Sequence, residues 1–443
     1  MDQKNALTYL HQLALSGAPI CTDSRTAISN SIYFALRGDN FNGNDFAAQA
    51  LSNGCRLAVI DDPTKKTNNN YLLVDDVLTT LQHLARLHRQ QFTVPVVGIT
   101  GSNGKTTTKE LIHAVLSSTF YSTATKGNLN NHIGVPRTLL DFREPLNIAI
   151  IEMGANHIHE IDKLCKLALP DYGLITNIGK AHLEGFGSFE NVVAAKTELY
   201  THIAENKGVL FVNGDDEILL KHSGNTQRIL YGKNNSYHCS GTILSAHPYL
   251  SISYHVNKAF GKTRQGARGT IHSNLTGSYN FDNILAAVTI GLFFGVADSS
   301  IVKAIESYHP SNNRSQLIET SRNKLIMDAY NANPTSMAAS ISNFLQYKSE
   351  GKTAVFLGDM LELGSYALQE HKHIFQIIKS NQFDLSVFVG NIFSQVVEAK
   401  DNIHIFPDVE TARNWLKNNP LNDYSILVKG SRGIKMETLQ AYL

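Results

Sequence analysis

The stretch VVGITGSNGKTTTKELIH (residues 96–113) constrains the fold more than any other part of the chain. Apolar residues lead into a glycine-rich turn that ends in Lys105 and Thr106, and residues at helical spacing follow. In such turns backbone N–H groups approach phosphate oxygens, and the start of the next helix attracts negative charge. Glycines stand at 98 and 101, whereas the strict phosphate-loop spacing would place one at Ile99. The stretch predicts a buried strand before a nucleoside triphosphate site, and the alternative is a glycine-rich turn that binds no ligand.

Composition sets the class of protein. The 443 residues predict about three domains, and 42% hydrophobic with 17% charged residues is a globular composition. A net charge of +1 gives no reason to expect nucleic acid or an anionic membrane as partner. The four cysteines lie far apart without CxxC spacing, and the sequence contains neither a signal-type start nor an apolar run of ~20 residues. We therefore expect a soluble, cytoplasmic monomer that does not insert into a membrane.

Strand-type and helix-type patterns alternate along the whole chain and predict an α/β fold. A small α/β unit comes first, and a central unit with a mostly parallel sheet contains the phosphate loop. Short alternating pieces at residues 227–276 predict an antiparallel extension of that central sheet. The connector HPSNNR (residues 309–314) precedes a second open-sheet, Rossmann-like unit. The predicted domains are residues 1–82, 83–313 and 314–443.

Residues around the predicted phosphate loop have the chemistry of a metal-dependent phosphoryl-transfer site. Lys105 would reach the β/γ oxygens, and the Thr106 hydroxyl would bind Mg²⁺. Glu152 ends the apolar run NIAIIEMG at the carboxyl edge of a parallel strand, where a magnesium ligand is useful; the alternative is a solvent-facing strand end. His182 follows the next predicted strand, although a histidine in that position is more often structural.

Lys196 lies on the helix after that loop, beside small apolar residues. A surface lysine is the ordinary interpretation. The other possibility is a buried lysine with a lowered pKa, because burial disfavours the charged form. Only the neutral amine can react with CO₂ to form a carbamate, which would act as an additional carboxylate for a metal.

Together and in this order, the motifs resemble those of the Mur ligases, the ATP-dependent amide-forming enzymes of peptidoglycan precursor synthesis. The similar strings are ITGSNGKTT, IEMGAN, NIGKAHLEGFGS, AAKTEL and GSYNFDNILAA. The resemblance implies one Mg²⁺ bound by Thr106 and Glu152, and a second held with the help of His182 and carbamylated Lys196. It implies catalytic roles for Lys105, Lys196, His182 and Arg314. It further implies ATP contacts from Thr100, Gly101, Ser102, Asn103, Gly104, Lys105, Thr106, Thr107, Asn280, Asn283, Arg314 and Asp328.

The two ends of the chain narrow the resemblance to members that add the terminal dipeptide. TDSRTAISNSIYFALRGDNFNGNDF (residues 22–46) is similar to a UDP-sugar-binding domain, which places Asp23, Ser24 and Arg25 near UDP. KGNLNNHIGVPRTLL, MDAYNANPTSM, FLGDMLELGSYALQEH and LVKGSRGIKME resemble segments of the dipeptide-adding members. The implied substrates are UDP-N-acetylmuramoyl-tripeptide and D-alanyl-D-alanine. Their implied contacts are Asn128, Asn130, Asn131, Tyr330, Asn331 and Asn333, although Asn-Pro in YNANP is also an ordinary turn signal. The family pattern has acidic residues where this chain has His132 and Met327.

The resemblance implies that ATP phosphorylates a peptide carboxylate and that the dipeptide amine attacks the resulting acyl phosphate. Folylpolyglutamate synthase and the ligase that adds the third stem residue are alternatives within the same superfamily. The absence of their C-terminal signatures and the presence of NLNNHIGVP argue against both, and the third-residue ligase would also be expected to show a DNPR-type motif, which the chain lacks. A guanine-nucleotide switch would carry NKxD, and the nearest string, NKLI, lacks the aspartate. A small-molecule phosphotransferase would not need Lys196. The third residue of the stem peptide, lysine or diaminopimelate, stays open.

Overall fold

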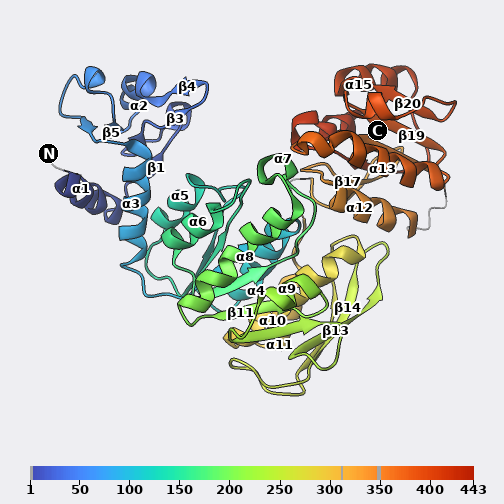
Figure 1. The fold of residues 1–443 in the computed structure, drawn as a ribbon, viewed down its shortest axis with the longest axis horizontal. Coiled ribbons are helices and arrows are strands. Elements are labelled where there is room, and N and C mark those ends of the chain that lie inside the picture. The colour runs from blue at the N-terminus through green and yellow to red at the C-terminus, as the bar shows by residue number, and fades with distance from the viewer. Residues whose placement is uncertain (1–2, 311–312, 347–350) are drawn as a thin grey trace.

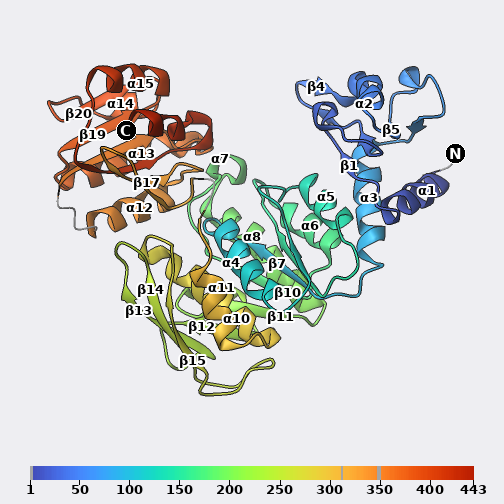
Figure 2. The same cartoon turned by 180° about the vertical axis from the view of Figure 1, so that it is seen from behind.

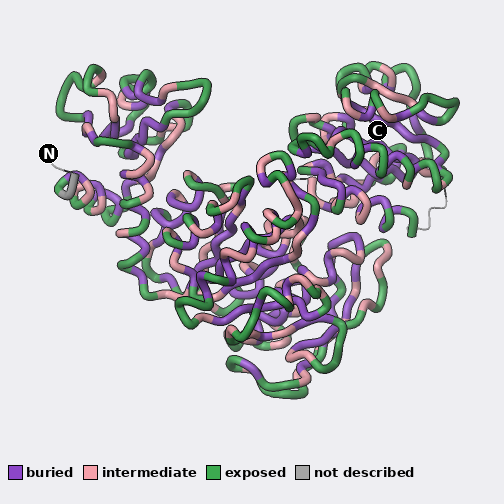
Figure 3. Tube along the Cα trace, viewed as in Figure 1, coloured by how far each residue is buried: buried purple, intermediate pink, exposed green. Residues whose placement is uncertain are grey.

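The computed structural model describes residues 3–310, 313–346 and 351–443, so that two residues of the predicted HPSNNR connector lie outside the described part. In these described ranges the chain forms three main sheets with covering helices and a separate two-stranded hairpin, arranged as two units that flank a larger central one (Figure 1). Buried residues run along the strands of each unit (Figure 3), and one apolar cluster continues through all three units. The predicted α/β class is confirmed. Within the described residues, no helix is both long and apolar enough to cross a bilayer.

The N-terminal unit is a small parallel sheet in the order β1-β2-β5-β6. Its strands are β1 (Ile20–Cys21), β2 (Ile32–Phe34), β5 (Leu57–Ile60) and β6 (Tyr71–Leu73), with helices α1 (Gln3–Leu15) and α2 (Ala47–Ser52) and a short hairpin, β3 (Arg37–Gly38) and β4 (Phe41–Asn42).

Helix α3 (Val77–Arg89) connects this unit to the central one. The Asp76 side chain accepts a hydrogen bond from Thr79 N at the helix start, and the helix packs on α1 on one side and on α5 and α6 of the central unit on the other. The predicted boundary after residue 82 therefore falls inside a continuous helix. That helix is amphipathic and gives buried residues to both neighbours, so no break in composition marks the change of unit.

The central unit is built on a nine-stranded sheet in the order β15-β14-β13-β12-β11-β10-β7-β9-β8. The strands are β7 (Val96–Thr100), β8 (Ser122–Ala124), β9 (Ile148–Glu152), β10 (Tyr172–Ile175), β11 (Val209–Asn213), β12 (Arg228–Gly232), β13 (Cys239–Ser245), β14 (Ser251–Val256) and β15 (Arg268–His272). All pairings from β8 to β13 are parallel, and only β13–β14 and β14–β15 are antiparallel. The antiparallel extension is thus narrower than residues 227–276 predicted, because the crossover through α9 (Glu217–His222) returns β12 parallel to β11.

Helices cover both faces of the central sheet, as the apolar character of its strands requires. Alternate residues of β9 serve different cores: Ile148 and Ile150 pack with α4 (Lys105–Ser117), α10 (Phe281–Phe294) and α11 (Asp298–Glu306). Ala149 and Ile151 pack with the opposite layer, formed by α5 (Gly134–Leu140), α6 (Glu160–Ala168) and α8 (Phe189–Glu205). A short helix, α7 (Leu183–Phe186), projects from the sheet toward the C-terminal unit, as the view from behind also shows (Figure 2).

The C-terminal unit is a six-stranded sheet in the order β16-β17-β21-β18-β19-β20, parallel except for β16. Its strands are β16 (Gln316–Glu319), β17 (Lys324–Asp328), β18 (Lys352–Gly358), β19 (Leu385–Val389), β20 (Ile403–Phe406) and β21 (Tyr424–Lys429). Its helices are α12 (Pro334–Gln346), α13 (Ala367–Ser380), α14 (Phe393–Val396) and α15 (Val409–Asn418). The carboxyl ends of β7, β9, β10, β17 and β21 all lead into the cleft between this unit and the central one.

Candidate active site

The phosphate loop joins the buried strand β7 to helix α4 in a turn that only glycine can make. Gly101 and Gly104 have φ values of 143° and 78°. A Cβ on Gly101 would lie 2.1 Å from Thr176 Oγ1, and one on Gly104 would lie 2.6 Å from Asn283 Oδ1. Asn283, predicted to contact ATP, thus lies directly against the loop. The geometry is that of a phosphate-binding turn at a helix N-terminus.

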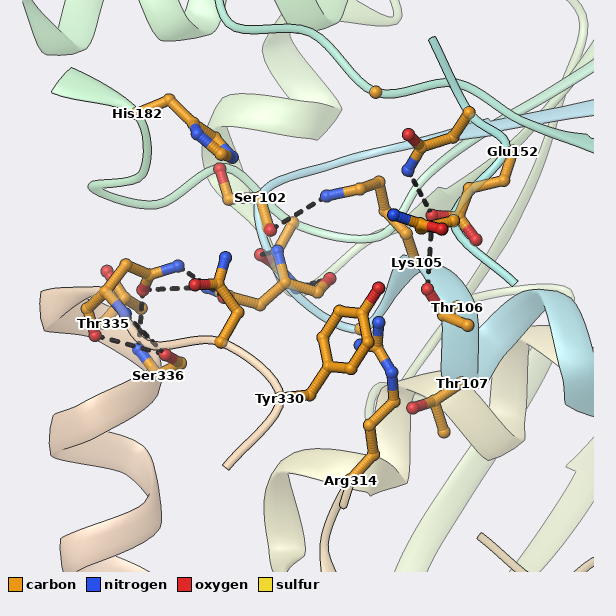
Figure 4. A pocket seen from close by; sticks show the side chains of 18 of the residues that line it. Ser102, Lys105, Thr106, Thr107, Glu152, His182, Arg314, Tyr330, Thr335 and Ser336 are labelled. Carbon is orange, nitrogen blue, oxygen red and sulfur yellow. Dashed lines mark hydrogen bonds between the residues drawn. The ribbon is translucent and has the colours of Figure 1, made fainter. Parts of the chain in front are cut away.

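Lys105 begins helix α4, and its side chain folds back along the loop (Figure 4). Its Nζ donates to Gly101 O at 2.7 Å and to Ser102 O at 3.1 Å. Burial lowers the pKa of Lys105, the nearby Arg314 charge lowers it further, and Glu152 opposes both. The ammonium group is therefore positioned at the cleft but held by carbonyls alone, which leaves it available to an incoming anion.

Glu152 is buried at the end of β9 and faces the cleft, not solvent. Its Oε1 accepts hydrogen bonds from Thr106 Oγ1 at 3.2 Å and from Asn130 Nδ2 at 2.8 Å. In the part of the chain that the structure describes, Oε2 is buried without a hydrogen-bond partner. The Lys109 ammonium lies 3.8 Å from this oxygen, beyond hydrogen-bond distance. A buried carboxylate oxygen without a hydrogen bond is costly, and a bound metal ion would satisfy it.

These groups fit a magnesium ion that takes few ligands from protein. Among residues 3–310, 313–346 and 351–443, no cluster of three His, Cys, Asp or Glu side chains forms a metal cage. Mg²⁺ usually keeps several waters and binds through one or two carboxylates together with substrate phosphates. Thr106 and Glu152 supply that kind of partial site.

His182 stands at the start of α7 with a left-handed backbone, φ 53°. Its Nδ1 lies 2.6 Å from Oε2 of Glu362, which belongs to the C-terminal unit. This contact lowers the pKa of the Glu362 carboxyl, against the opposing effect of burial. Glu362 lines the cleft and was not singled out from the sequence, although it lies inside the motif FLGDMLELGSYALQEH. Its acidic side chain within a motif that resembles the family could have identified Glu362 as a candidate site residue.

Lys196 is buried on α8, with 1% of its surface exposed, so the surface-lysine interpretation was wrong. Its Nζ donates to Ala155 O at 3.2 Å and lies 5.3 Å from the centre of the Phe186 ring. Burial, with a smaller contribution from the Lys105 charge, moves the pKa of Lys196 well below its ordinary value. Lys196 does not itself line the cleft, but its acceptor residue Ala155 does.

The C-terminal unit closes the other side of the cleft, which has a volume of about 670 Å³. The Arg314 guanidinium stacks 3.5 Å from the centre of the Tyr330 ring, and both point toward the phosphate loop (Figure 4). Asp328 Oδ2 accepts from Lys429 Nζ at 2.6 Å. Asn333 Nδ2 donates to Asn103 Oδ1 at 2.7 Å and Asn103 Nδ2 donates back to Asn333 Oδ1 at 3.5 Å, so that paired side-chain hydrogen bonds connect the YNANP segment to the phosphate loop.

The cleft brings together most of the residues predicted from the sequence. They are Ser102, Asn103, Gly104, Lys105, Thr106, Thr107, Asn128, Asn130, Asn131, Glu152, His182, Asn280, Asn283, Arg314, Asp328, Tyr330, Asn331 and Asn333. Thr100, Gly101 and Lys196 do not line it. Unpredicted lining residues include Lys163, Thr335, Glu362, Lys429 and Arg432.

Three predicted residues and one of the two departures from the family pattern lie elsewhere. Asp23, Ser24 and Arg25 belong to the N-terminal unit, where the Asp23 and Arg25 side chains pair with each other at 2.7 Å. The Arg25 hydrogen bonds lower the pKa of Asp23 to about 2. His132 lines the cleft, whereas Met327 is fully buried in the C-terminal core and presents nothing to it.

Comparison with known proteins gives full-length similarity. Family models match the Mur ligase middle domain over residues 99–291 and the Mur ligase glutamate ligase domain over residues 313–432. The chain is 35% identical over 430 residues to UDP-N-acetylmuramoyl-tripeptide–D-alanyl-D-alanine ligase of Bacillus subtilis, covering 95% of this chain and 92% of that one. MurF from Acinetobacter baumannii superimposes with a TM-score of 0.85 at 32% identity, covering 97% of each chain. MurF from Thermotoga maritima, solved in complex with ADP, superimposes with a TM-score of 0.82 at 25% identity and the same coverage.

Proposed function

Because the chain belongs to the Mur ligase family, we propose that it joins D-alanyl-D-alanine to UDP-N-acetylmuramoyl-tripeptide at the expense of ATP. The reaction forms an amide bond and yields the pentapeptide precursor, ADP and phosphate. The observation that carries the proposal is the cleft itself. In it, the phosphate loop and the buried Glu152 carboxylate, whose Oε2 makes no hydrogen bond, face the C-terminal unit, and the whole chain superimposes on similar ligases.

The chemistry requires an activated carboxylate, because a free carboxylate is a poor electrophile. The γ-phosphoryl group of ATP passes to the tripeptide carboxylate and gives an acyl phosphate. The dipeptide amine then attacks the carbonyl carbon, a tetrahedral anion forms, and phosphate leaves with its bonding electron pair while the amine loses a proton. Holding the three reactants together is worth up to about 7–11 kcal/mol in favourable cases.

Residues of the central unit neutralise the transferring phosphoryl group. Two carbonyls hold Lys105 Nζ in the structure, and on ATP binding this group moves to the phosphate oxygens. The backbone N–H groups at the start of α4 donate to the same oxygens. Arg314, stacked on Tyr330, supplies a further positive charge from the C-terminal side. Thr106 and Glu152 would hold a magnesium ion, which would supply further positive charge for phosphoryl transfer.

We propose that Lys196 is carbamylated and, with His182, helps hold a second magnesium ion. The buried position and lowered pKa of Lys196 favour the neutral amine that CO₂ requires. The amine nitrogen bonds to the carbon of CO₂ and releases a proton, which leaves a carboxylate-like group. The Nζ of the unmodified lysine donates to Ala155 O, and Ala155 lines the cleft.

The substrates divide among the three units. The N-terminal unit, with Asp23, Ser24 and Arg25, holds the UDP end of the acceptor. Asn128, Asn130 and Asn131 contact its peptide, and Tyr330, Asn331 and Asn333 contact the incoming dipeptide. The domains 1–82, 83–313 and 314–443 stay predictions, as do adenine contacts from Asn280 and Asn283 and a location in the cytoplasm.

The test is phosphate release from ATP in the presence of UDP-N-acetylmuramoyl-tripeptide, with and without D-alanyl-D-alanine. We expect release to depend on the dipeptide and the product to gain the dipeptide's mass less one water. Release that ignores the dipeptide, or a product without that mass, would overturn the proposal. Tripeptides ending in lysine and in diaminopimelate, compared side by side, identify the third stem residue. A UDP-linked dipeptide offered with either free amino acid tests the alternative ligase.

A further inference from the structure

Lys109 is a fully buried lysine on α4, one helical turn beyond Lys105, and the reaction described above does not use it. A buried ammonium group costs free energy unless it is paired and hydrogen-bonded. Lys109 Nζ donates to Thr125 O and lies 3.5 Å from Gly127 O. It also lies 2.9 Å from Glu110 Oε1 and 3.8 Å from Glu152 Oε2. The charge therefore serves a set of polar contacts and is not packed in a purely apolar core.

The two carbonyl groups that Lys109 contacts, those of Thr125 and Gly127, lie at the start of the segment Thr125–Asn131. This segment carries the asparagines predicted to contact the UDP-linked peptide. The same segment is tied to the end of β9: Glu152 N donates to Thr125 Oγ1 at 2.9 Å, and Gly154 N donates to Asn130 O at 2.7 Å. Asn130 Nδ2 adds the hydrogen bond to Glu152 Oε1. Lys109 thus makes a direct contact between this segment and the phosphate-loop helix, while Thr106 and Asn130 meet indirectly on Glu152 Oε1.

We infer that Lys109 is a positioning residue: it fixes the segment Thr125–Asn131 to helix α4, so that the acceptor carboxylate is held at the γ-phosphate. The inference rests on the proposed function, since it assumes that this segment binds the UDP-linked peptide. Lys109 is absent from the lining of the cleft, whereas Asn128, Asn130 and Asn131 belong to it. Its removal therefore acts on acceptor binding through the segment and leaves the nucleotide contacts of Lys105 and Thr106 in place.

The central test is Lys109→Met, which keeps the length and the buried volume but leaves Thr125 O without its donor. We expect the KM for UDP-N-acetylmuramoyl-tripeptide to rise at least about five-fold, and its calorimetric Kd to rise in parallel. The Kd for ADP should change less than about two-fold. Amide hydrogen exchange should become faster in residues 125–131 and stay unchanged in residues 96–117.

Two further variants complete the design. Lys109→Arg, which restores a charged donor, should recover most of the lost acceptor affinity. Glu110→Gln is the matched control, because it removes the half-exposed carboxylate partner of Lys109 and leaves both backbone contacts. It should behave as wild type. If Lys109→Met shows no cooperative thermal transition, Lys109→Gln replaces it in the comparison. Glutamine retains a neutral donor, so this variant should show a loss of acceptor affinity between those of Lys109→Arg and Lys109→Met.

Equal losses of ADP and acceptor binding, or an unchanged acceptor Kd together with unchanged exchange, would overturn the inference. These results are distinct from failure of the proposed function. In that case the wild-type protein itself would not turn over the tripeptide, while the exchange and ADP measurements would still report whether Lys109 holds the segment.

Discussion

His182 Nδ1 lies 2.6 Å from Glu362 Oε2, and this contact connects the central unit to the C-terminal unit at the edge of the cleft. The backbone reinforces it, since Glu184 N donates to Glu362 O at 3.1 Å. Lys180, on the same loop, pairs with the buried carboxylate of Glu370 at 2.6 Å. The loop that carries a proposed metal-binding histidine therefore also contributes contacts between the two units.

Lys180→Met is expected to loosen the two units. The change leaves the Glu370 carboxylate, 5% exposed, without its cation, and because Lys180 is half exposed the cost is about 1–2 kcal/mol. Small-angle scattering should show a larger radius of gyration than for wild type. Lys221→Met, on the exposed face of α9, is the control and should leave scattering unchanged. Identical scattering from both variants would contradict a role for the pair.

Glu152→Gln is expected to weaken magnesium binding. The amide can keep hydrogen bonds to Thr106 and Asn130 but loses the negative charge that Oε2, which makes no hydrogen bond, offers to a metal ion. We expect turnover to fall about 10²-fold or more and the magnesium titration of phosphate release to shift to higher concentration. Glu160→Gln is the matched control, since that carboxylate lines the same cleft but accepts from Asn156 N and His157 N. A chelator should abolish turnover by wild type, and a magnesium titration identical to that of wild type would count against Glu152 as a ligand.

Lys196→Ala is expected to abolish turnover and to be rescued in part by formate or acetate. A small carboxylic acid can enter the space left by the side chain and replace the charge of the carbamate. Lys196→Arg should not be rescued, because the guanidinium fills the space and does not react with CO₂. Turnover measured against acid concentration gives the result. Loss of turnover without any rescue would leave only a structural role for the lysine.

Asp282→Asn is expected to stabilise the protein at neutral pH. Burial raises the pKa of Asp282 from 3.8 to about 6, with Lys233 opposing the shift. The folded state therefore disfavours the charged form, and the stability of wild type falls as pH rises from about 4 to about 6 and then stays level. Allowing for its remaining exposure, we expect an advantage of about 1–2 kcal/mol for the variant at pH 7.5, shrinking toward zero near pH 4.

Denaturant unfolding of Asp282→Asn at pH 4.5, 6 and 7.5 measures this difference. The exposed carboxylate Asp75 provides the control, since Asp75→Asn changes charge at the surface of the N-terminal unit. A difference that grows as pH falls would have the wrong sign and would exclude burial as the cause.

The parts predicted correctly from the sequence are those set by local chemistry. The spacing of apolar residues predicted the strand before the phosphate loop and the start of α4 at Lys105. The conformational freedom of glycine predicted the turn at Gly101 and Gly104. All of these features lie within about ten residues of one another. The alternation of strands and helices predicted the α/β class for the same reason. The function was predicted in addition because the short motifs resemble those of the Mur ligases.

Contacts between segments far apart in the sequence could not be predicted from local patterns, because they depend on how the units pack. Burial of Lys196 depends on α8 packing against the sheet, and the Glu362 contact with His182 depends on the position of a separate unit. Lys109 is an unremarkable lysine in the string KTTTKE until Thr125 and Gly127 surround it. Periodicity fixes which side of an element is apolar, but the partner of a buried charge is fixed by contacts between segments far apart in the chain. The nucleotide-binding framework therefore follows from local sequence, whereas the pairs of charges inside it, such as His182 with Glu362, arise from contacts made in the folded protein.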